Sequence, residues 1–395
     1  MEAVKVLVWN VEKFTEAKFQ AKVIITGNWS KKRLRLPIDE LLAYMEMVFT
    51  GNGNASHTPE VIAILEALAP DNQDLGELLD RNSGGARGLV AMLNYIKQWT
   101  NNNNWRLVPP LKCNTQKPAN TPWAQSEVVG VFYDTSRVTF NGPNAWINNQ
   151  SQQPGAGAAA QYDAGVNSIW NDAAITNSTT LAGQVRFYET NGNEILFPND
   201  QNRRPFLVDF TEQYGNNRKI RMAFMHTSPG FHLGGTRSMG KIAELTPTGG
   251  TDPTISIAAG DFNVNDYHTN SANKAYRPLS NRRFRKMLKK NEDYSTHYYR
   301  KRDAKPDTWD TYQQHMLIDN FLVWHRTKTA ANQATYEKAS VDAALGFPNP
   351  YVSTMNIPIA NYPNYTNPVE AFRWWENFWH IRKASDHTPI FLDIQ

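Results

Sequence analysis

Polar side chains able to act on a phosphate ester follow an apolar run in the second half of the chain. Residues 255–259 are typical of a buried strand, which ends in Gly260 and Asp261. Gly260 allows the backbone to bend there, and Asn263 points to the same side as Asp261 if the strand continues. A carboxylate can orient water or a metal ion, and an amide can hold a phosphoryl oxygen. The pair suits phosphate-ester hydrolysis, although Asp-x-Asn is also common in turns.

Polar residues at the ends of apolar runs recur along the chain. Asn10, Glu66 and His226 also follow apolar runs, whereas Glu127 and His387 precede them. Antiparallel strands would bring these side chains to one edge of a sheet, where catalytic residues normally lie. Besides the run described above, strands are predicted at residues 4–9, 22–26, 60–65, 128–133, 206–210, 220–225, 316–324 and 388–394.

The spacing of apolar residues also predicts two helices, one opened by Pro37 and one within residues 81–99. Short buried strands with helices between some of them favour a layered α/β fold. Residues 141–202 are rich in Asn, Gln, Gly and Ala, which predicts a surface insertion rather than a second domain. The length of 395 residues fits one large domain or two ordinary ones, and no internal repeat is visible.

The composition limits the class of protein. Of the 395 residues 41% are hydrophobic and 12% aromatic, which suffices for a core and excludes wholesale disorder. The net charge of +4 is compatible with an anionic partner but does not require one. A single cysteine, Cys113, excludes an internal disulfide and an all-cysteine metal site.

The beginning of the sequence shows no basic, apolar and small-residue segments of a classical signal peptide. No run approaches the roughly 20 apolar residues that a membrane span requires. We therefore expect no transmembrane segment, and a location that is cytoplasmic or reached without a classical signal. No protein partner can be predicted.

Five motifs occur in an order that resembles the endonuclease/exonuclease/phosphatase superfamily of metal-dependent phosphoesterases. They are WNVE at 9–12, a strand closing on Glu66, GDFN at 260–263, LIDNFLV at 317–323 and SDHTPI at 385–390. The resemblance spans nearly the whole chain, which implies that residues 1–395 form a single domain with the surface insertion at about 141–202. It implies a four-layer α/β sandwich, with two packed, mostly antiparallel β-sheets flanked by helices.

Within that superfamily the chain is most similar to the pancreatic-type deoxyribonucleases. SEVVGVFYDTSRV at 126–138 and MHTSPG at 225–230 resemble the segments that carry their Glu–His pair, here Glu127 and His226. RRPFLVDF at 203–210 resembles their Arg-x-Pro strand and makes Arg203 the expected phosphate contact. The chain departs from these enzymes in having no disulfide and no basic residue at 67–70, and residues 141–202 have no counterpart.

The resemblance also implies a metal ion. Glu66 is the first choice of ligand, with Asn10 beside it, and an oxygen shell with open positions suits Mg²⁺ or Mn²⁺, with Ca²⁺ as a further candidate. Asp386 either approaches the metal or caps a turn. Glu12 is either near the metal or an ordinary surface acid. Asn10 is also a candidate phosphate contact.

Two acid–imidazole pairs would carry the chemistry. A carboxylate that accepts from one ring nitrogen fixes the tautomer and raises the basicity of the other nitrogen. Asp319 is expected to orient His387, and Glu127 to pair with His226. One imidazole would activate or orient the water and the other would protonate the leaving 3′ oxygen, with their roles left open.

Other parts of the site follow from the same resemblance. Asp261 would orient the nucleophile, and Asn263 would steady the phosphoryl oxygens. The remaining histidines are predicted to have no role: His57, His232, His268, His297, His315, His325 and His380.

The leading hypothesis is a divalent-metal nuclease that cuts DNA with low sequence selectivity. Cleavage of RNA as well is left open. A phosphomonoesterase or phospholipid phosphodiesterase is the alternative, and a binding protein without turnover is a third. The basic stretches 31–35 and 281–290 would contact nucleic acid or form solvated faces. For the second stretch, apolar residues at helical spacing favour a helix with a solvated face.

Overall fold

The structure is a computed structural model that describes only part of the chain. The described residues are 4–19, 42, 45–46, 48–50, 58–69, 83–108, 110–114, 126–142, 187–197, 203–214, 217–246, 253–288, 296–297, 316–326, 337–341, 385–387 and 389–394. The predicted strand at 22–26 and the basic stretch 31–35 lie outside them, as do His57, His315 and His380.

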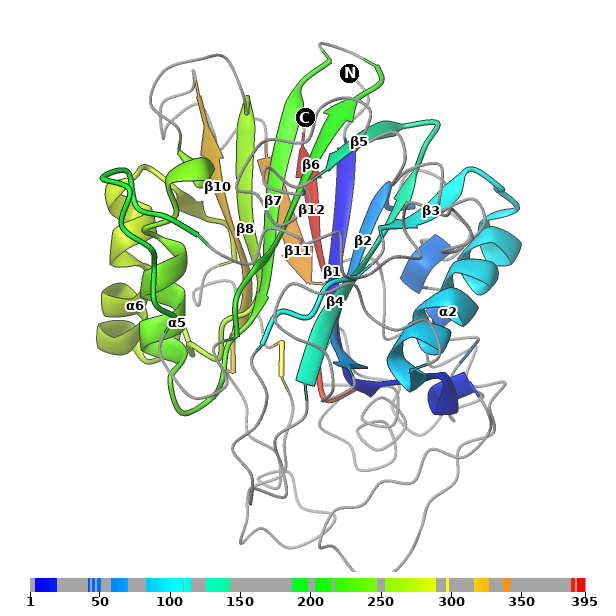
Figure 1. Ribbon diagram of the computed structural model, residues 1–395, viewed down its shortest axis with the longest axis horizontal. Helices are drawn as coiled ribbons and strands as arrows, with labels where there is room; N and C mark the ends of the chain where they lie inside the picture. The colour runs from blue at the N-terminus through cyan, green and yellow to red at the C-terminus, as the bar shows by residue number, and fades with distance from the viewer. Residues whose placement is uncertain are drawn as a thin grey trace, which may run out of the picture.

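Two sheets form the centre of the molecule (Figure 1). The first has the order β11-β12-β1-β2-β4-β3, with β1 Val4–Phe14, β2 Val61–Ala69, β3 Trp105–Val108, β4 Ser126–Asp134, β11 Glu337–Val341 and β12 Ile390–Ile394. The second has the order β5-β6-β7-β8-β10-β9, with β5 Val138–Gly142, β6 Phe206–Glu212, β7 Lys219–His226, β8 Ile255–Asp261, β9 Arg285–Lys286 and β10 Asp319–His325.

Most neighbouring strands are antiparallel, and each sheet contains one parallel pair, β1 with β2 and β7 with β8. In the part of the chain that the structure describes, the sheets are flanked by the helices α2 Gly84–Thr100, α5 His232–Met239 and α6 Thr269–Asn281. The described residues also include the short 3-10 helices η1 Glu16–Phe19 and η3 Ala243–Leu245. In Figure 1, α2 lies on one side of the sheets while α5 and α6 lie together on the other. The expected four-layer α/β sandwich is confirmed.

Burial explains why the strands read as continuous apolar runs. All seven residues of β8 are buried, because one face of its sheet packs on the other sheet and the other face packs under α5 and α6. Ile257 belongs to the core between the sheets, and its neighbour Ala258 belongs to the cluster beneath the helices. Asp261, the charged residue of β8, is the last residue of the strand.

Helix α2 confirms the helix predicted within 81–99. The Ser83 hydroxyl accepts from the Ala86 N–H at 3.1 Å, a standard N-cap, and Asn101 ends the helix in the left-handed region with a φ of 49°. Leu89 and Ile96 lie on its buried face. Residues 42, 45–46 and 48–50 are also helical, which agrees with the helix expected after Pro37, although Pro37 itself lies outside the described residues.

Several expectations need correction. Strand β1 continues through Asn10 to Phe14, and β2 continues past Glu66 to Ala69, so neither polar residue ends its strand. The basic stretch 281–290, of which the structure describes residues 281–288, was expected to be helical. Helix α6 ends at Asn281 instead, and the two-residue strand β9 that follows pairs with β10.

Of the predicted surface insertion at 141–202, the structure describes residues 141–142 and 187–197. Within it, Phe187, Ile195 and Phe197 are buried in the cluster beneath α5 and α6. The backbone of Tyr188 pairs with that of Glu194, so residues 187–197 fold back on themselves and join the core. Among the described residues, no helix is both long enough and apolar enough to cross a membrane.

Candidate active site

Strand pairing aligns the first group of polar side chains. In the parallel pair β7–β8, His226 stands opposite Asp261, and in the antiparallel pair β8–β10, Asp319 stands opposite Asp261. Three neighbouring strands of the second sheet therefore end or begin at the same level. Of the residues expected to gather at one edge, this pairing brings His226 beside Asp261, through a parallel rather than an antiparallel pair, and it places Asp319, which was not among them, next to Asp261.

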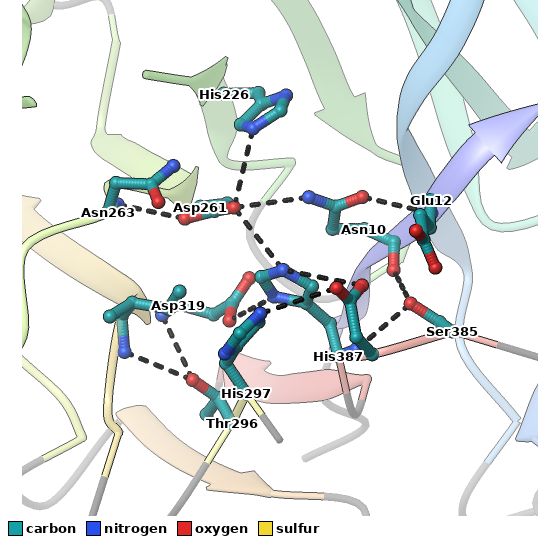
Figure 2. A network of polar contacts seen from close by, with 12 residues as sticks. Asn10, Glu12, His226, Asp261, Asn263, Thr296, His297, Asp319, Ser385 and His387 are labelled. Atoms are coloured by element: carbon teal, nitrogen blue, oxygen red, sulfur yellow. Dashed lines mark hydrogen bonds and ion pairs between the residues drawn. The ribbon is translucent and has the colours of Figure 1, made fainter. Parts of the chain in front are cut away.

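Asp261 lies at the centre of the group and is almost fully buried (Figure 2). Its Oδ2 accepts a hydrogen bond from Asn10 Nδ2 at 3.1 Å, and its Oδ1 accepts one from the Asn263 N–H at 2.8 Å. The backbone of Asn263 is left-handed, with a φ of 49°, so the strand ends at Asp261 in a turn. The two side chains are therefore not related by strand alternation, and Asn263 Nδ2 donates to the Thr227 carbonyl at 2.8 Å.

One acid–imidazole pair joins His387 and Asp319. His387 Nδ1 lies 2.8 Å from Asp319 Oδ2, and both residues are buried. Burial disfavours the charged imidazolium, but the carboxylates of Asp319 and Asp261 outweigh it and raise the pKa of His387 to about 10. Trp9 Nε1 donates to the His387 carbonyl at 2.9 Å and fixes the backbone of this residue.

The second pair joins His226 and Glu127. His226 Nδ1 lies 2.7 Å from Glu127 Oε2, and Arg203 Nη2 donates to Glu127 Oε1 at 2.8 Å. Burial favours a neutral Glu127, but the positive charges of His226 and Arg203 prevail and hold the pKa of this carboxyl below its ordinary value. Burial and the Arg203 charge both disfavour the imidazolium of His226, yet Glu127 raises the pKa of His226 above its ordinary value.

Arg203 thus holds the second pair in place. Its Nη1 lies 3.1 Å from His226 Nε2 and donates to the Thr227 carbonyl at 3.2 Å. The sequence predicted Arg203 as a phosphate contact. In this structure its guanidinium bridges the carboxylate and the imidazole of the pair.

Both pairs face the same carboxylate oxygen. His226 Nε2 and His387 Nε2 each lie 3.5 Å from Asp261 Oδ2. Figure 2 shows Asp261 between the two imidazole rings, with Asn10 approaching from a third direction. Two imidazole nitrogens and one carboxylate therefore converge on one spot, which can hold a water molecule or an anionic group of the substrate.

Glu66 lies beside the second pair at an irregular point of β2. The register against β4 shifts between Ile64 and Ala67, and Glu66 has a left-handed φ of 61°. Burial, followed by the negative charges of Glu127, Asp386 and Glu12, raises the pKa of Glu66 to about 7. Carboxylates brought together in this way favour a cation, so the residues fit an oxygen-bound divalent metal.

Other proposed metal ligands are placed differently. Asn10 Oδ1 accepts the Glu12 N–H at 3.1 Å while Nδ2 is bonded to Asp261, so its amide serves chiefly to position Asp261. Among the described residues, two groups of three have ligand atoms within 4.8 Å of one another, and Glu66 is in neither. They are His297, Asp386 and His387, and Asp261, Asp319 and His387.

Sequence reasoning missed His297, which lies next to His387. His297 Nε2 is 3.4 Å from Asp386 Oδ2, and the His297 and His387 rings are 4.6 Å apart between centroids. No motif signals this residue, because it comes 90 positions before His387 in the sequence. Of the other histidines predicted to have no role, His232 lies half-buried at the start of α5, His268 is exposed before α6, and His325 is buried at the end of β10.

No protein-family model matches the sequence, and no curated protein does. Solved structures similar to the chain include D. rerio TDP2 complexed with single strand DNA product, at 11% identity and a TM-score of 0.42. Others are an endonuclease/exonuclease/phosphatase family protein from Leptotrichia buccalis, at 12% and 0.44, and a beta toxin from Staphylococcus aureus with bound magnesium ions, at 12% and 0.41. Each of the three matches covers 100% of this chain and 100% of the other.

Proposed function

We propose that this chain is a divalent-metal-dependent phosphodiesterase of the endonuclease/exonuclease/phosphatase superfamily. Its substrate is nucleic acid, DNA before RNA, cut with low sequence specificity. One observation carries the proposal: two acid–imidazole pairs direct their Nε2 atoms at the same oxygen of Asp261, each from 3.5 Å. Hydrolysis of a phosphodiester requires a proton acceptor for the water, a proton donor for the leaving oxygen and positive charge around the phosphate.

The arrangement supplies each of these. Asp261, held by Asn10 and the Asn263 N–H, orients the attacking water and accepts its proton as the oxygen bonds to phosphorus. The bond from phosphorus to the 3′ oxygen breaks, and an imidazolium donates the proton that this oxygen takes. The pKa of His387 is raised to about 10, so its ring favours the cationic form, and the raised pKa of His226 shifts that ring toward the same form. Positive charge on these rings also attracts the phosphate.

Glu66 and Asp386 would hold Mg²⁺ or Mn²⁺ beside this centre, with Ca²⁺ as a weaker candidate. When bound, the ion would neutralise charge on the non-bridging phosphate oxygens. Burial, followed by the negative charges of Glu127 and Asp386, raises the pKa of Glu66 to about 7, and a bound cation would offset the repulsion between these carboxylates.

The decisive test is cleavage of supercoiled plasmid, linear DNA, RNA and inositol phosphates by the purified chain with Mg²⁺ or Mn²⁺. We expect metal-dependent nicking of DNA, abolished by chelation and reduced about 10²- to 10⁴-fold in His226→Gln and His387→Gln. His268→Gln, an exposed histidine, is the matched control. Intact DNA together with release of phosphate from inositol phosphates would replace the proposal by a phosphomonoesterase.

A second substrate identifies the proton donor. Bis(p-nitrophenyl) phosphate releases an anion that needs no protonation, so loss of the donor imidazole should harm cleavage of DNA far more than cleavage of this ester. Loss of an imidazole that acts on water should harm both reactions alike. If each histidine variant loses cleavage of DNA and cleavage of this ester to the same extent, neither ring donates the proton.

A further inference from the structure

His297 is fixed beside His387 by the backbone. The two residues form an isolated antiparallel β-bridge, and the neighbouring Thr296 is fully buried against the start of β10. The Thr296 hydroxyl accepts the N–H groups of Ile318 and Asp319, each at 3.1 Å, and the His297 N–H donates to the Met316 carbonyl at 3.2 Å. Figure 2 shows Thr296 and His297 together below the Asp319–His387 pair. Residues 296–297 are therefore hydrogen-bonded to the segment 316–319, which leads into β10 and carries Asp319.

The spacing of three side chains suits direct coordination of a metal. His297 Nε2 lies 3.4 Å from Asp386 Oδ2, and His387 Nε2 lies 3.9 Å from Asp386 Oδ1. Ligands about 2.1 Å from a tetrahedral ion stand roughly 3.4 Å apart, so small movements would let all three bind one ion. His387 Nδ1 is already bonded to Asp319, which is the carboxylate–histidine arrangement that orients a metal-binding imidazole.

The donor set differs in kind from that around Glu66. Two imidazole nitrogens and one carboxylate favour zinc and its first-row neighbours, whereas Mg²⁺ prefers oxygen ligands and keeps its waters. An ion in this position would take Asp386 from the magnesium site and His387 Nε2 from proton transfer. It would therefore oppose the reaction.

We propose that His297, Asp386 and His387 form a binding site for a zinc-class transition-metal ion, and that its occupation inhibits the enzyme. Only the inhibition rests on the proposed function. The binding site stands on the geometry of the three side chains.

Binding is tested without any reaction, by titrating the metal-free full chain with Co²⁺ and recording visible absorption. We expect the wild type to bind one Co²⁺ with the intense bands of a low-coordinate site. His297→Gln should weaken this binding at least tenfold, while His268→Gln should leave it unchanged. Circular dichroism shows whether His297→Gln stays folded, and His297→Asn serves as a second variant. Equal Co²⁺ binding by the wild type and both His297 variants, or none by the wild type, would overturn the site.

Inhibition is tested by adding Zn²⁺ to the plasmid-cleavage reaction in excess Mg²⁺. His297→Gln should keep the wild-type rate without zinc and require at least tenfold more Zn²⁺ for half-inhibition. An unchanged zinc dependence would refute inhibition through this site. If the chain cleaves no phosphodiester at all, the proposed function fails, yet the Co²⁺ titration still decides the metal site.

Discussion

The two acid–imidazole pairs are built differently although their central contacts have nearly equal lengths. Glu127 also accepts from Arg203, and that charge helps to keep the carboxyl ionised. Asp319 has no such contact among the hydrogen bonds described for it, and burial raises its pKa despite the opposing charge of His387. The charge of Asp319 therefore depends on His387 more than the charge of Glu127 depends on His226.

This dependence predicts the effect of Asp319→Asn. The amide keeps the shape of the carboxyl but cannot stabilise an imidazolium, so the pKa of His387 should fall from about 10 toward its ordinary value. We expect kcat on DNA to drop about 10²- to 10⁴-fold with little change in KM. Ring-proton NMR of the metal-free variant measures the pKa, and plasmid cleavage measures kcat. Glu189→Gln, which removes a surface ion pair with Lys241, should change neither quantity.

An undisturbed pKa of His387 in Asp319→Asn would contradict the pairing itself. A shifted pKa with unchanged kcat would instead show that this imidazole takes no part in the rate-limiting chemistry. The pKa therefore tests whether Asp319 pairs with His387, and kcat tests whether His387 takes part in the reaction.

At the scale of elements, the sequence predicted the long buried strands and α2 because their apolar patterns are long and continuous. It could not predict α5, where Gly234 and Gly235 interrupt the apolar spacing, or α6, which contains Pro278. The register shift at Glu66 could not be predicted either, because a shift in strand pairing does not change the pattern of apolar residues in the sequence. His297 was missed for a different reason: the residue with which it forms a bridge, His387, lies 90 positions later in the chain.

The close approach of α2 to β2 supports the irregular segment around Glu66. A Cβ on Gly85 would lie 1.9 Å from the Leu68 carbonyl oxygen, whereas a Cβ on Gly84 would lie 3.7 Å from its nearest neighbour, Thr15. Gly85→Ala must push the helix away from the strand, and we expect a loss of about 2 to 4 kcal/mol of unfolding free energy.

Gly84→Ala is the matched control at the adjacent position and should be close to neutral. Urea unfolding measures both variants, and the metal dependence of cleavage shows whether Glu66 is displaced in Gly85→Ala. Equal stabilities of the two variants would mean that α2 does not need this contact.

At the scale of the whole molecule, the site exists only because the two sheets pack together. Asn10 and Glu127 come from the first sheet and contact Asp261 and His226 of the second. His387, just before β12 of the first sheet, pairs with Asp319 of the second. The acid–imidazole pairs thus join the two halves, and any loss of packing between the sheets separates each acid from its imidazole.

Glu60 lies just before β2, six residues before Glu66, and predicts how stability depends on pH. Its Oε2 accepts the Lys5 N–H at 2.5 Å, and Arg137 lies 3.5 Å from Oε1, but burial outweighs both and raises the pKa of Glu60 to about 7. A carboxyl whose folded pKa exceeds its unfolded value contributes stability below about pH 4.5 and loses it as the pH rises to about 7.

Replacing Glu60 by Gln removes this titration while keeping the shape of the side chain. The unfolding free energy of the wild type, relative to Glu60→Gln, should therefore fall by about 2 to 3 kcal/mol between pH 4.5 and pH 7.5. Urea unfolding at several pH values measures this difference, and Glu46→Gln, at an exposed helical position, should follow the wild type. If the difference does not change with pH, the ion pair with Arg137 must already compensate for burial, and Glu60 is ionised throughout this range.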